Sequence, residues 1–367
     1  MSARTARVSE AGVSIWLDDL SRHRLSSGNL ARLIDTRHVV GVTTNPTIFA
    51  QAIGSGVGYE EAIAQCARDG LGAQETITRL TTHDVSDACD LLMPIWERSS
   101  GRDGRVSIEV EPALAHDAPG TVARAAELWN LVDRPNAMIK IPATTAGLSA
   151  ITDTLASGIS VNVTLLFSLT RYREVLNATL LGLERARAAG HDLRTIHSVA
   201  SFFVSRVDTE VDRRLKEIGT PEALELTGTA GVANARLAYE IFQQYYTSER
   251  AQHLLSQGAH RQRLLWASTG VKDPALPDTL YVSALVAPEV VNTMPEATLE
   301  AFADHGETPE FPFTHFRESD HALNCIDAFG IDYQQVTGQL EQEGVQKFLQ
   351  SWNDLVDTVT RALDAVR

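Results

Sequence analysis

Cysteine is scarce in this sequence, which has only Cys66, Cys89 and Cys325 among its 367 residues. An odd number of cysteines without CxxC spacing indicates neither a disulfide framework nor a zinc site, so we interpret them as reduced packing residues. The eleven histidines are scattered, and no HxH or HExxH pattern places two of them on one face as metal ligands. The sequence therefore disfavours a mechanism that depends on a metal ion.

Positive charge and long apolar runs are also lacking. The chain has 32 Lys and Arg against 47 Asp and Glu, which gives a net charge of -15 and a pI of about 5.2. This balance argues against a nucleic-acid partner and against adhesion to an anionic membrane. No stretch approaches the roughly 18 apolar residues that cross a bilayer, and the start, MSARTARVSEAGVS, lacks the apolar centre of a signal peptide. We expect a soluble, cytoplasmic protein in which a few local cations bind any phosphate.

Short apolar, β-branched runs alternate with helix-like stretches along most of the chain. Eight runs predict strands, at residues 13–18, 38–45, 105–111, 137–143, 159–167, 196–204, 263–269 and 279–286. The segments between them carry apolar residues at helical spacing, and the helix predicted within 168–190 ends on Gly190 as a C-cap. This alternation predicts a (β/α)8 barrel, although a doubly wound open sheet has a similar pattern.

Two segments exceed the plain barrel pattern. The gap between the second and third predicted strands holds more than one helix, and about eighty residues follow the eighth, ending in a helical stretch at 342–366. We predict one barrel domain over residues 1–367, with about 305–367 as a helical C-terminal extension. The glycines of GSGVG at 54–58 do not follow a strand directly, so we interpret them as a loop before a helix.

Lys140 interrupts the apolar fourth run, which reads NAMIKIPATTAG over residues 136–147. Lysine is almost never fully buried without a partner, because removing its charge from water costs several kcal/mol. One interpretation is a structural ion pair, which is the commoner role of an isolated strand lysine. The other is an amine kept partly neutral so that it attacks a carbonyl.

Alternation along the strands predicts which side chains face the lumen, because the outward set must be apolar to pack on the helices. The predicted outward residues include Ile15, Leu17, Val40, Val42, Val106, Ile108, Val110, Ile139, Ile141, Val161, Val163 and Leu165. The opposite faces carry Ser14, Trp16, Asp18, Thr43, Asn45, Ser107, Glu109, Glu111, Lys140, Ser160, Asn162 and Thr164. Asp19 has the other parity, so of the two neighbouring aspartates we assign Asp18 to the lumen.

Six polar residues are thus predicted together at the carboxyl ends of the strands, where barrels build active sites. They are Lys140, Glu109, Asp18, Asn45, Asn162 and Thr164. A neutral amine adds to a ketone, a carboxylate moves protons directly or through a water, and the resulting protonated Schiff base draws electrons from a carbon–carbon bond that breaks. Arg206 beyond the sixth strand is a candidate for binding phosphate, since its planar fork matches phosphate oxygens. Lys272 after the seventh is a second candidate, with a solvated surface charge as its equally weighted alternative.

Four segments resemble signatures of the transaldolase family, specifically its longer bacterial type. They are GVTTNPTIF (41–49), MIKIPATTAGLSA (138–150), VNVTLLFS (161–168) and SFFVSR (201–206), and the resemblance runs from about residue 12 to about residue 300. It implies a class I aldolase barrel in which Lys140 forms the Schiff base and Asp18 is the acid/base for the sugar hydroxyl. It further implies that Glu109 works with Thr164 through a bound water.

The resemblance also implies a substrate-binding set. Asn45, Asn162 and Ser201 would hold a dihydroxyacetone part and Arg206 the phosphate, with Thr43, Phe203 and Lys272 completing the set. The implied reaction moves dihydroxyacetone from sedoheptulose 7-phosphate or fructose 6-phosphate to an aldose phosphate, in the non-oxidative pentose phosphate pathway. It implies sugar-phosphate partners, no cofactor or metal, and a monomer or homodimer.

Two alternatives remain open at this stage. Lysine-dependent aldolases that only cleave fructose 6-phosphate resemble the same motifs, but they tend to have a glutamine in place of Glu109 and a tyrosine in place of Phe203. Both residues therefore favour transfer. A non-catalytic sugar-phosphate sensor is disfavoured, since binding alone needs no neutral lysine.

Overall fold

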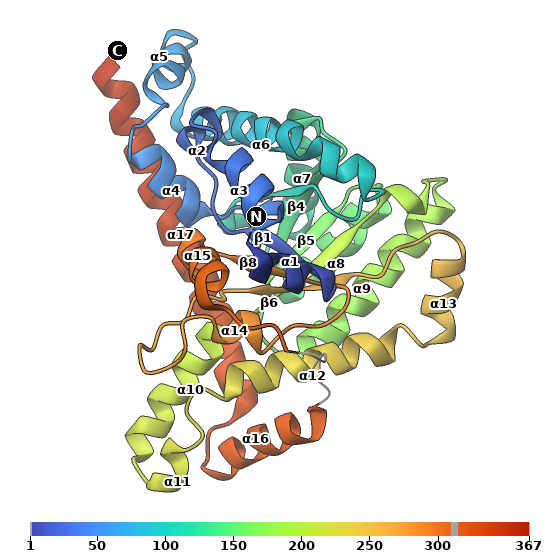
Figure 1. Cartoon of the computed structure of the whole chain (residues 1–367). Coiled ribbons are helices and arrows are strands. Elements are labelled where there is room, and N and C mark those ends of the chain that lie inside the picture. The colour runs from blue at the N-terminus through green and yellow to red at the C-terminus, as the bar shows by residue number, and fades with distance from the viewer. Residues whose placement is uncertain (1, 310–314, 367) are drawn as a thin grey trace.

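Eight parallel strands close into a barrel in the computed structural model, which describes residues 2–309 and 315–366 (Figure 1). The strands pair in sequential order, each with its neighbours along the chain, and β1 pairs with β8. They are β1 Val13–Leu17, β2 Val39–Thr43, β3 Arg105–Glu109, β4 Ala137–Pro142, β5 Val161–Leu166, β6 Ser198–Phe203, β7 Arg263–Ala267 and β8 Val290–Met294. The predicted barrel is confirmed.

Helices surround this barrel and extend beyond it. Those that precede β6 are α1 Ala3–Glu10, α2 Arg22–Ser26, α3 Asn29–Arg37, α4 Pro46–Gly54, α5 Glu60–Arg68, α6 Ala73–Arg98, η1 Pro112–Leu114, α7 Ala118–Val132, α8 Thr145–Ala156, α9 Leu169–Ala188 and η2 Leu193–Thr195. The rest are α10 Ser205–Ile218, α11 Pro221–Leu224, α12 Ala230–Tyr245, α13 Glu249–Ser256, α14 Leu280–Ser283, α15 Glu296–His305, α16 Phe316–Ala328 and α17 Tyr333–Val366. The extra helices predicted between β2 and β3 are α4, α5 and α6.

The predicted eighth strand is wrong. Residues 279–286 contain the short helix α14, whose Tyr281 hydroxyl donates to Asp208 Oδ2 at 2.7 Å. The closing strand is instead Val290–Met294, which pairs with all of β1. A short apolar run does not by itself distinguish a buried helical turn from a strand. Pairing with β1 determines which segment is the closing strand, and this pairing joins the first and last strands of the barrel.

The apolar side chains form two layers that follow the predicted alternation. Ile15, Leu17, Val106, Ile108, Ile139 and Ile141 belong to the outer layer, between strands and helices. Trp16 and Met138 belong to a second cluster, which also includes side chains of α10 and α17. Trp16 lies directly against Gly41 of β2, where an added Cβ would be 2.5 Å from Trp16 Cε2. Only glycine therefore leaves room for this indole inside the barrel.

Leu165 and Glu111 depart from the predicted alternation. Leu165 belongs to the second cluster instead of the outer layer and lies against Gly344 of α17, because it adopts a left-handed φ of 55° where the register between β5 and β6 shifts. Glu111 follows the end of β3 and forms an ion pair with Arg124 of α7 at 2.6 Å, outside the lumen. The alternation therefore holds only while the chain keeps its regular strand conformation.

The smaller predictions mostly agree with the structure. GSGVG connects α4 to α5, with Gly56 and Gly58 at φ of 77° and 84°, as expected for a loop. Gly190 has φ 88° and lies one residue beyond the C-cap Ala189, so the predicted cap is displaced by one position. All three cysteines are free, and Cys66 and Cys89 are buried. Among the described residues, no helix combines the length and apolarity needed to cross a membrane.

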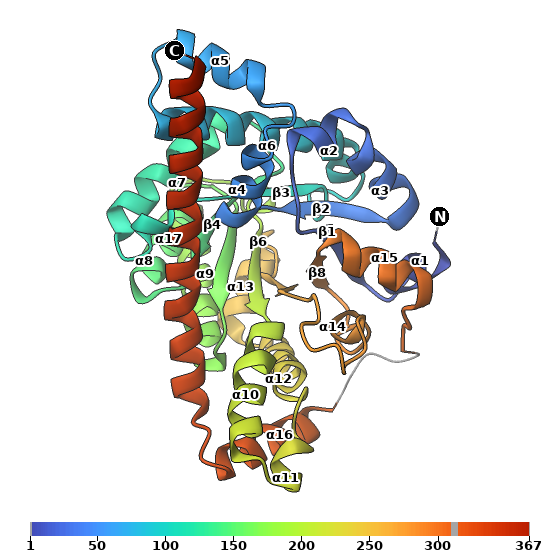
Figure 2. The ribbon, with the colours of Figure 1, turned by 90° about the vertical axis from the view of Figure 1, so that its left-hand side faces the viewer.

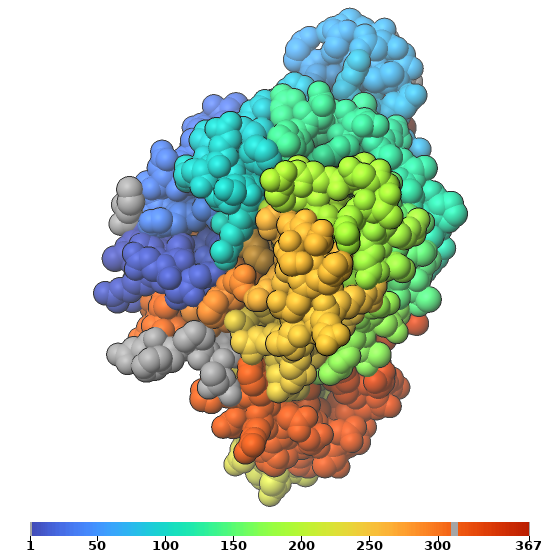
Figure 3. All heavy atoms as spheres, turned by 90° about the vertical axis from the view of Figure 1, so that its right-hand side faces the viewer, coloured from blue at the N-terminus to red at the C-terminus, as the bar shows by residue number. Residues whose placement is uncertain are grey.

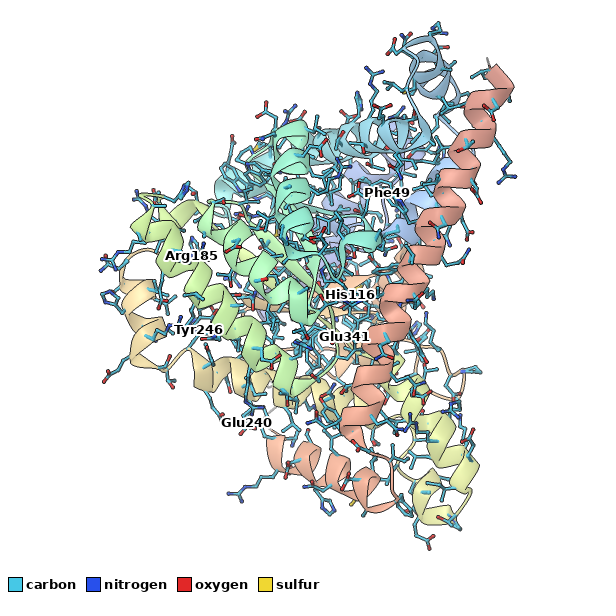
Figure 4. The ribbon with its side chains drawn as sticks, turned by 180° about the vertical axis from the view of Figure 1, so that it is seen from behind. Phe49, His116, Arg185, Glu240, Tyr246 and Glu341 are labelled. Atoms are coloured by element: carbon cyan, nitrogen blue, oxygen red, sulfur yellow. The ribbon has the colours of Figure 1, made fainter. Side chains whose placement is uncertain are left out.

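The C-terminal helix α17 crosses the carboxyl end of the barrel (Figure 2). It packs most extensively on α4, and it also contacts α5, α6, α10 and η1. Seen from behind, its long axis spans the molecule from α16 to α5, with Phe49 of α4 and Glu341 of α17 labelled on the way (Figure 4). The predicted helical extension is present, and its position brings it to the barrel mouth.

Candidate active site

Lys140 points into the barrel from β4 and is only 4% exposed. The strand register places it between Glu109 of β3 and Asn162 of β5. Its Nζ lies 3.2 Å from Glu109 Oε2 and donates a hydrogen bond to the Thr44 carbonyl at 3.0 Å. Lys140 therefore forms an ion pair and is also the candidate nucleophile.

Two acidic groups share the space around this amine. Asp18 Oδ1 accepts a hydrogen bond from Thr43 Oγ1 at 2.8 Å, and Thr43 also contacts Thr293. Burial raises the pKa of Asp18, although the charge of Lys140 opposes the shift. Burial likewise raises the pKa of Glu109, again opposed by Lys140. Each carboxyl group is thus held closer to its protonated form than it is in water.

Asp19 faces away from the lumen and pairs with Arg24 of α2, as the alternation predicts. Asn45 reaches the site through its position at the start of α4, where its Oδ1 accepts from the backbone N–H of Ile48 at 3.0 Å. Pro46 follows at the first helical position, which suits its fixed φ. The local Asn-Pro pair therefore begins the helix and orients the amide at the barrel mouth.

A chain of hydrogen bonds fixes the amide of Asn162. Its Nδ2 donates to Ser107 Oγ at 3.0 Å, and its Oδ1 accepts from Ser201 Oγ at 2.7 Å. Among the described residues, the buried Thr164 Oγ1 has no hydrogen-bond partner, and Glu109 Oε2 has only its ion pair with Lys140. Both of these oxygens therefore have hydrogen-bonding capacity to offer to a ligand or water.

A cavity of about 250 Å³ opens above these groups. Of the predicted site residues, its walls contain Lys140, Asp18, Thr43, Asn45, Ser201, Phe203, Arg206 and Lys272. The other three predicted residues lie beside it in the lumen. Glu109 contacts Lys140, Asn162 accepts a hydrogen bond from Ser201, and Thr164 pairs with β4. The structure thus places all eleven predicted residues in one region.

Three cations gather at the outer end of this cavity: Arg206, Lys272 and Lys347. The Arg206 guanidinium lies 5.3 Å from the Phe203 ring centre and 6.0 Å from that of Phe348. Burial lowers the pKa of Arg206, and the nearby charge of Arg206 lowers that of Lys347. Within residues 2–309 and 315–366 none of the three cations forms an ion pair, so an anion would relieve their mutual repulsion.

Lys347 and Phe348 are site residues that the sequence analysis missed. Both lie on α17, and Phe348 also lies 6.0 Å from Lys140 Nζ, measured to its ring centre. Gly344, one turn earlier, lets the helix approach closely, since an added Cβ would lie 2.9 Å from Leu165. The sequence signal was a helix with a buried stripe, but that pattern does not say which end of the barrel the helix covers.

The described residues contain no group of three or more His, Cys, Asp or Glu side chains arranged to hold a metal ion. The arrangement brings together an amine, two carboxyl groups and oriented amides and hydroxyls, which are groups that carbonyl-directed chemistry uses.

Comparison with known proteins gives a consistent assignment. A family model described as Transaldolase/Fructose-6-phosphate aldolase matches residues 15–359. Transaldolase 1 of Streptomyces coelicolor is 58% identical over 360 residues, which cover 98% of this chain and 94% of the relative. Transaldolase of Kocuria rhizophila is 58% identical over 368 residues and the whole of both chains. Transaldolase of Mycolicibacterium smegmatis is 57% identical, covering 99% of this chain and 98% of the relative.

Proposed function

Because the chain belongs to the transaldolase/fructose-6-phosphate aldolase family, we propose that it transfers a dihydroxyacetone unit through a Schiff base on Lys140. The donor is sedoheptulose 7-phosphate or fructose 6-phosphate, and the acceptor is glyceraldehyde 3-phosphate or erythrose 4-phosphate. One observation carries the proposal: a buried amine lies 3.2 Å from one carboxyl group, with a second lining the same cavity. The setting is the non-oxidative pentose phosphate pathway.

The first step joins Lys140 to the donor ketone. The unprotonated Nζ attacks the carbonyl carbon C2, and the carbinolamine then loses water to become a protonated imine. Glu109 gives the proton that leaves with this water, a task that suits a carboxyl group whose pKa is raised by burial. Thr164 supports the exchange, since its Oγ1 and Glu109 Oε2 are both available to bind a water molecule.

The second step breaks the carbon–carbon bond. Asp18 takes the proton of the C4 hydroxyl, the C3–C4 bond breaks, and the electron pair moves into the imine to form an enamine. The aldose fragment leaves, and an acceptor aldehyde then adds to the enamine carbon while Asp18 returns the proton to its oxygen. Hydrolysis of the new imine reverses the first step and frees the product. The raised pKa of Asp18 suits a group that gains and returns a proton.

The remaining site residues bind the substrate. Asn45, Thr43, Asn162 and Ser201 offer hydrogen bonds to the hydroxyls of the dihydroxyacetone part near Lys140. Arg206 and Lys272 bind the phosphate at the outer end, together with Lys347 of α17. The absence of ion-pair partners for these cations among the described residues supports this role.

Simple cleavage of fructose 6-phosphate is the second candidate function. Glu109 and Phe203 favour transfer, because the cleaving enzymes tend to have glutamine and tyrosine at these positions. We further propose sugar phosphates as the substrates, a cytoplasmic location, a single barrel domain over residues 1–367, and a monomer or homodimer. Sedimentation equilibrium distinguishes the two assembly states.

Reductive trapping tests the proposed chemistry. The protein is incubated with fructose 6-phosphate, treated with borohydride and digested, and we expect a dihydroxyacetone adduct on Lys140 by mass spectrometry. Lys140→Met should give no adduct, whereas the control Lys216→Met, an exposed lysine paired with Asp273, should still give one. A sensor gives no adduct in the native protein. Release of free dihydroxyacetone at full rate without an acceptor would identify the cleaving aldolase instead.

A further inference from the structure

A second cavity lies at the opposite end of the barrel from Lys140. It has a volume of about 220 Å³, and Arg105, Ser198 and Arg263, which line it, are the first residues of β3, β6 and β7. Figure 3 views the molecule from the side opposite α17, where the surface is hollowed between the teal segment near residue 100 and the gold segment near residue 260. The proposed reaction uses none of these residues.

Arg105 is the most unusual side chain in this cavity. It is only 1% exposed, yet its Nε donates to the Gly101 carbonyl at 2.7 Å and its Nη1 to the Pro135 carbonyl at 3.2 Å. No ion pair joins it to a carboxylate in the described part of the chain. A buried guanidinium held only by neutral carbonyls is costly. Burial, and then the charge of the neighbouring Arg263, lower the pKa of Arg105 to about 9.

Arg263, the second buried guanidinium, is 8% exposed and has one acidic partner. Its Nη1 donates to Ser14 Oγ at 2.7 Å, and its Nη2 contacts Asp103 Oδ1 at 3.0 Å. At the rim, exposed Arg261 pairs with Glu289 at 2.8 Å, and Arg102 is exposed. Four guanidiniums thus face two carboxylates, which leaves two positive charges without a partner.

Two histidines also line this cavity. His197 is stacked on His260, with ring centres 4.0 Å apart. Burial and then the charge of Arg105 lower the pKa of His197 to about 2, so its imidazole is uncharged at neutral pH. His197 therefore adds no charge to the two unpaired positive charges of the arginines, and a dianion would balance those two charges.

We propose that this cavity binds a phosphate dianion, either the free ion or the phosphoryl group of a small metabolite. Guanidinium forks match tetrahedral oxygens in geometry, and a phosphate accepts several charge-assisted hydrogen bonds at once. This site is separate from the substrate phosphate site, because the barrel lumen and its core cluster lie between them. Its occupancy does not depend on the proposed catalytic function.

Phosphate binding to variants of the full chain tests the proposal. The active-site contribution is removed first with Arg206→Ala/Lys347→Ala, and radiolabelled inorganic phosphate is measured by equilibrium dialysis at constant ionic strength. This double variant should bind about one phosphate per chain. Adding Arg102→Ala and Arg261→Ala, which change only exposed side chains, should weaken that binding at least tenfold. No saturable phosphate binding by the double variant would overturn the proposal, as would binding that the rim substitutions leave unchanged.

A buried variant and a second ligand sharpen the result. Arg105→Met in the same background should abolish binding while circular dichroism remains that of a folded protein; unchanged binding by folded Arg105→Met would contradict the proposal. Glycerol 3-phosphate, titrated in parallel, separates the two sources of the phosphate group. Tighter binding of inorganic phosphate assigns the site to the free ion, and tighter binding of the ester assigns it to a metabolite.

Discussion

Gly41 and Trp16 show how closely single residues define the interior of this barrel. A Cβ at position 41 would lie 2.5 Å from the Trp16 indole, whereas Gly338 on the exposed side of α17 has nothing within 4 Å of such an atom. The same change therefore has opposite expected effects at the two positions.

We predict that Gly41→Ala lowers the free energy of unfolding by about 1–3 kcal/mol, because the indole must move within a packed core. Gly338→Ala should raise it by up to about 1 kcal/mol, since alanine is the better helix former. Urea denaturation of both variants measures the difference. A Gly41→Ala protein as stable as the native one would show that the lumen repacks easily.

The buried pair of Lys140 and Glu109 gives a second residue-scale prediction. Lys140→Met leaves the Glu109 carboxyl group without its cation, so at pH 8 we expect a loss of roughly 3 kcal/mol in unfolding free energy. Adding Glu109→Gln should recover most of this loss, because it removes the carboxylate that has lost its cation. Both proteins should lack turnover.

The pH dependence checks this explanation. The pKa of Glu109 is already raised by burial, and without Lys140 the opposing effect disappears and it rises further. The folded single variant therefore holds a proton over a pH range where the unfolded chain has released it, and its deficit relative to the double variant should shrink as pH falls from 8 to 5. A deficit that is constant over this range would contradict a charge-based origin.

At this scale the sequence predicted most of the candidate site, because alternation along a strand is a local rule. Lys140, Asp18 and Asp19 all lie as their parity predicts. Leu165 and Glu111 do not, since one adopts a left-handed φ and the other follows the strand end. These are changes of backbone geometry that side-chain pattern alone does not reveal.

Among the elements, α17 makes the largest contribution to the candidate site that the sequence did not predict. It brings Lys347 and Phe348 to the active-site cavity, more than 200 residues after Lys140 in the chain. Its amphipathic pattern predicted a packed helix, but the surface it covers is set by contacts with α4, α6 and α10. For the same reason the apolar run at 279–286 predicts a strand but contains α14, since pairing with β1, not local composition, selects β8.

We predict that Lys347→Ala raises the KM for fructose 6-phosphate about fivefold, with kcat changed less than twofold. A partly exposed charged contact to phosphate contributes about 1 kcal/mol, and it acts equally in the bound and transition states. Steady-state kinetics measure both constants. Arg361→Ala is the matched control, because this exposed cation lies on the same helix and outside the cavity.

Unphosphorylated fructose provides the decisive comparison for Lys347. Its weak turnover should be the same in native and Lys347→Ala proteins, because the sugar has no phosphate to bind. An equal loss with both donors would mean that Lys347 acts by holding α17 in place.

The whole molecule has different charge arrangements at its two barrel ends. Carboxyl groups face an amine at the carboxyl end, while four arginines and two histidines surround the cavity at the amino end. The sequence predicted the barrel and the end of it that holds the candidate site, because strand periodicity and family motifs report on both. It did not reveal the cavity at the other end, since Arg105, His197 and Arg263 come from segments far apart in the chain and have no shared motif.

This arrangement predicts an acid sensitivity of the whole fold that originates at His197. Its pKa is lowered to about 2 by burial and the charges of Arg105, His260 and Arg263, against an ordinary value of 6.5. Between these two pH values the unfolded chain binds a proton at this residue that the folded protein does not. Stability is therefore lost as pH falls below about 6.5, by at most about 1.4 kcal/mol per pH unit.

His197→Phe should reduce this loss, because the ring still stacks on His260 but binds no proton. We expect the difference in unfolding free energy between variant and native protein to grow in favour of the variant as pH falls from 7 to 5, in buffers free of phosphate and sulfate. Burial raises the pKa of Asp208 to about 6, so this residue has the opposite effect on the pH dependence of stability. Subtracting the native unfolding free energy from that of the variant cancels this effect. His191→Phe, at an exposed position after α9, is the control and should leave the pH slope unchanged. If both substitutions change the slope equally, the acid sensitivity does not come from the buried imidazole.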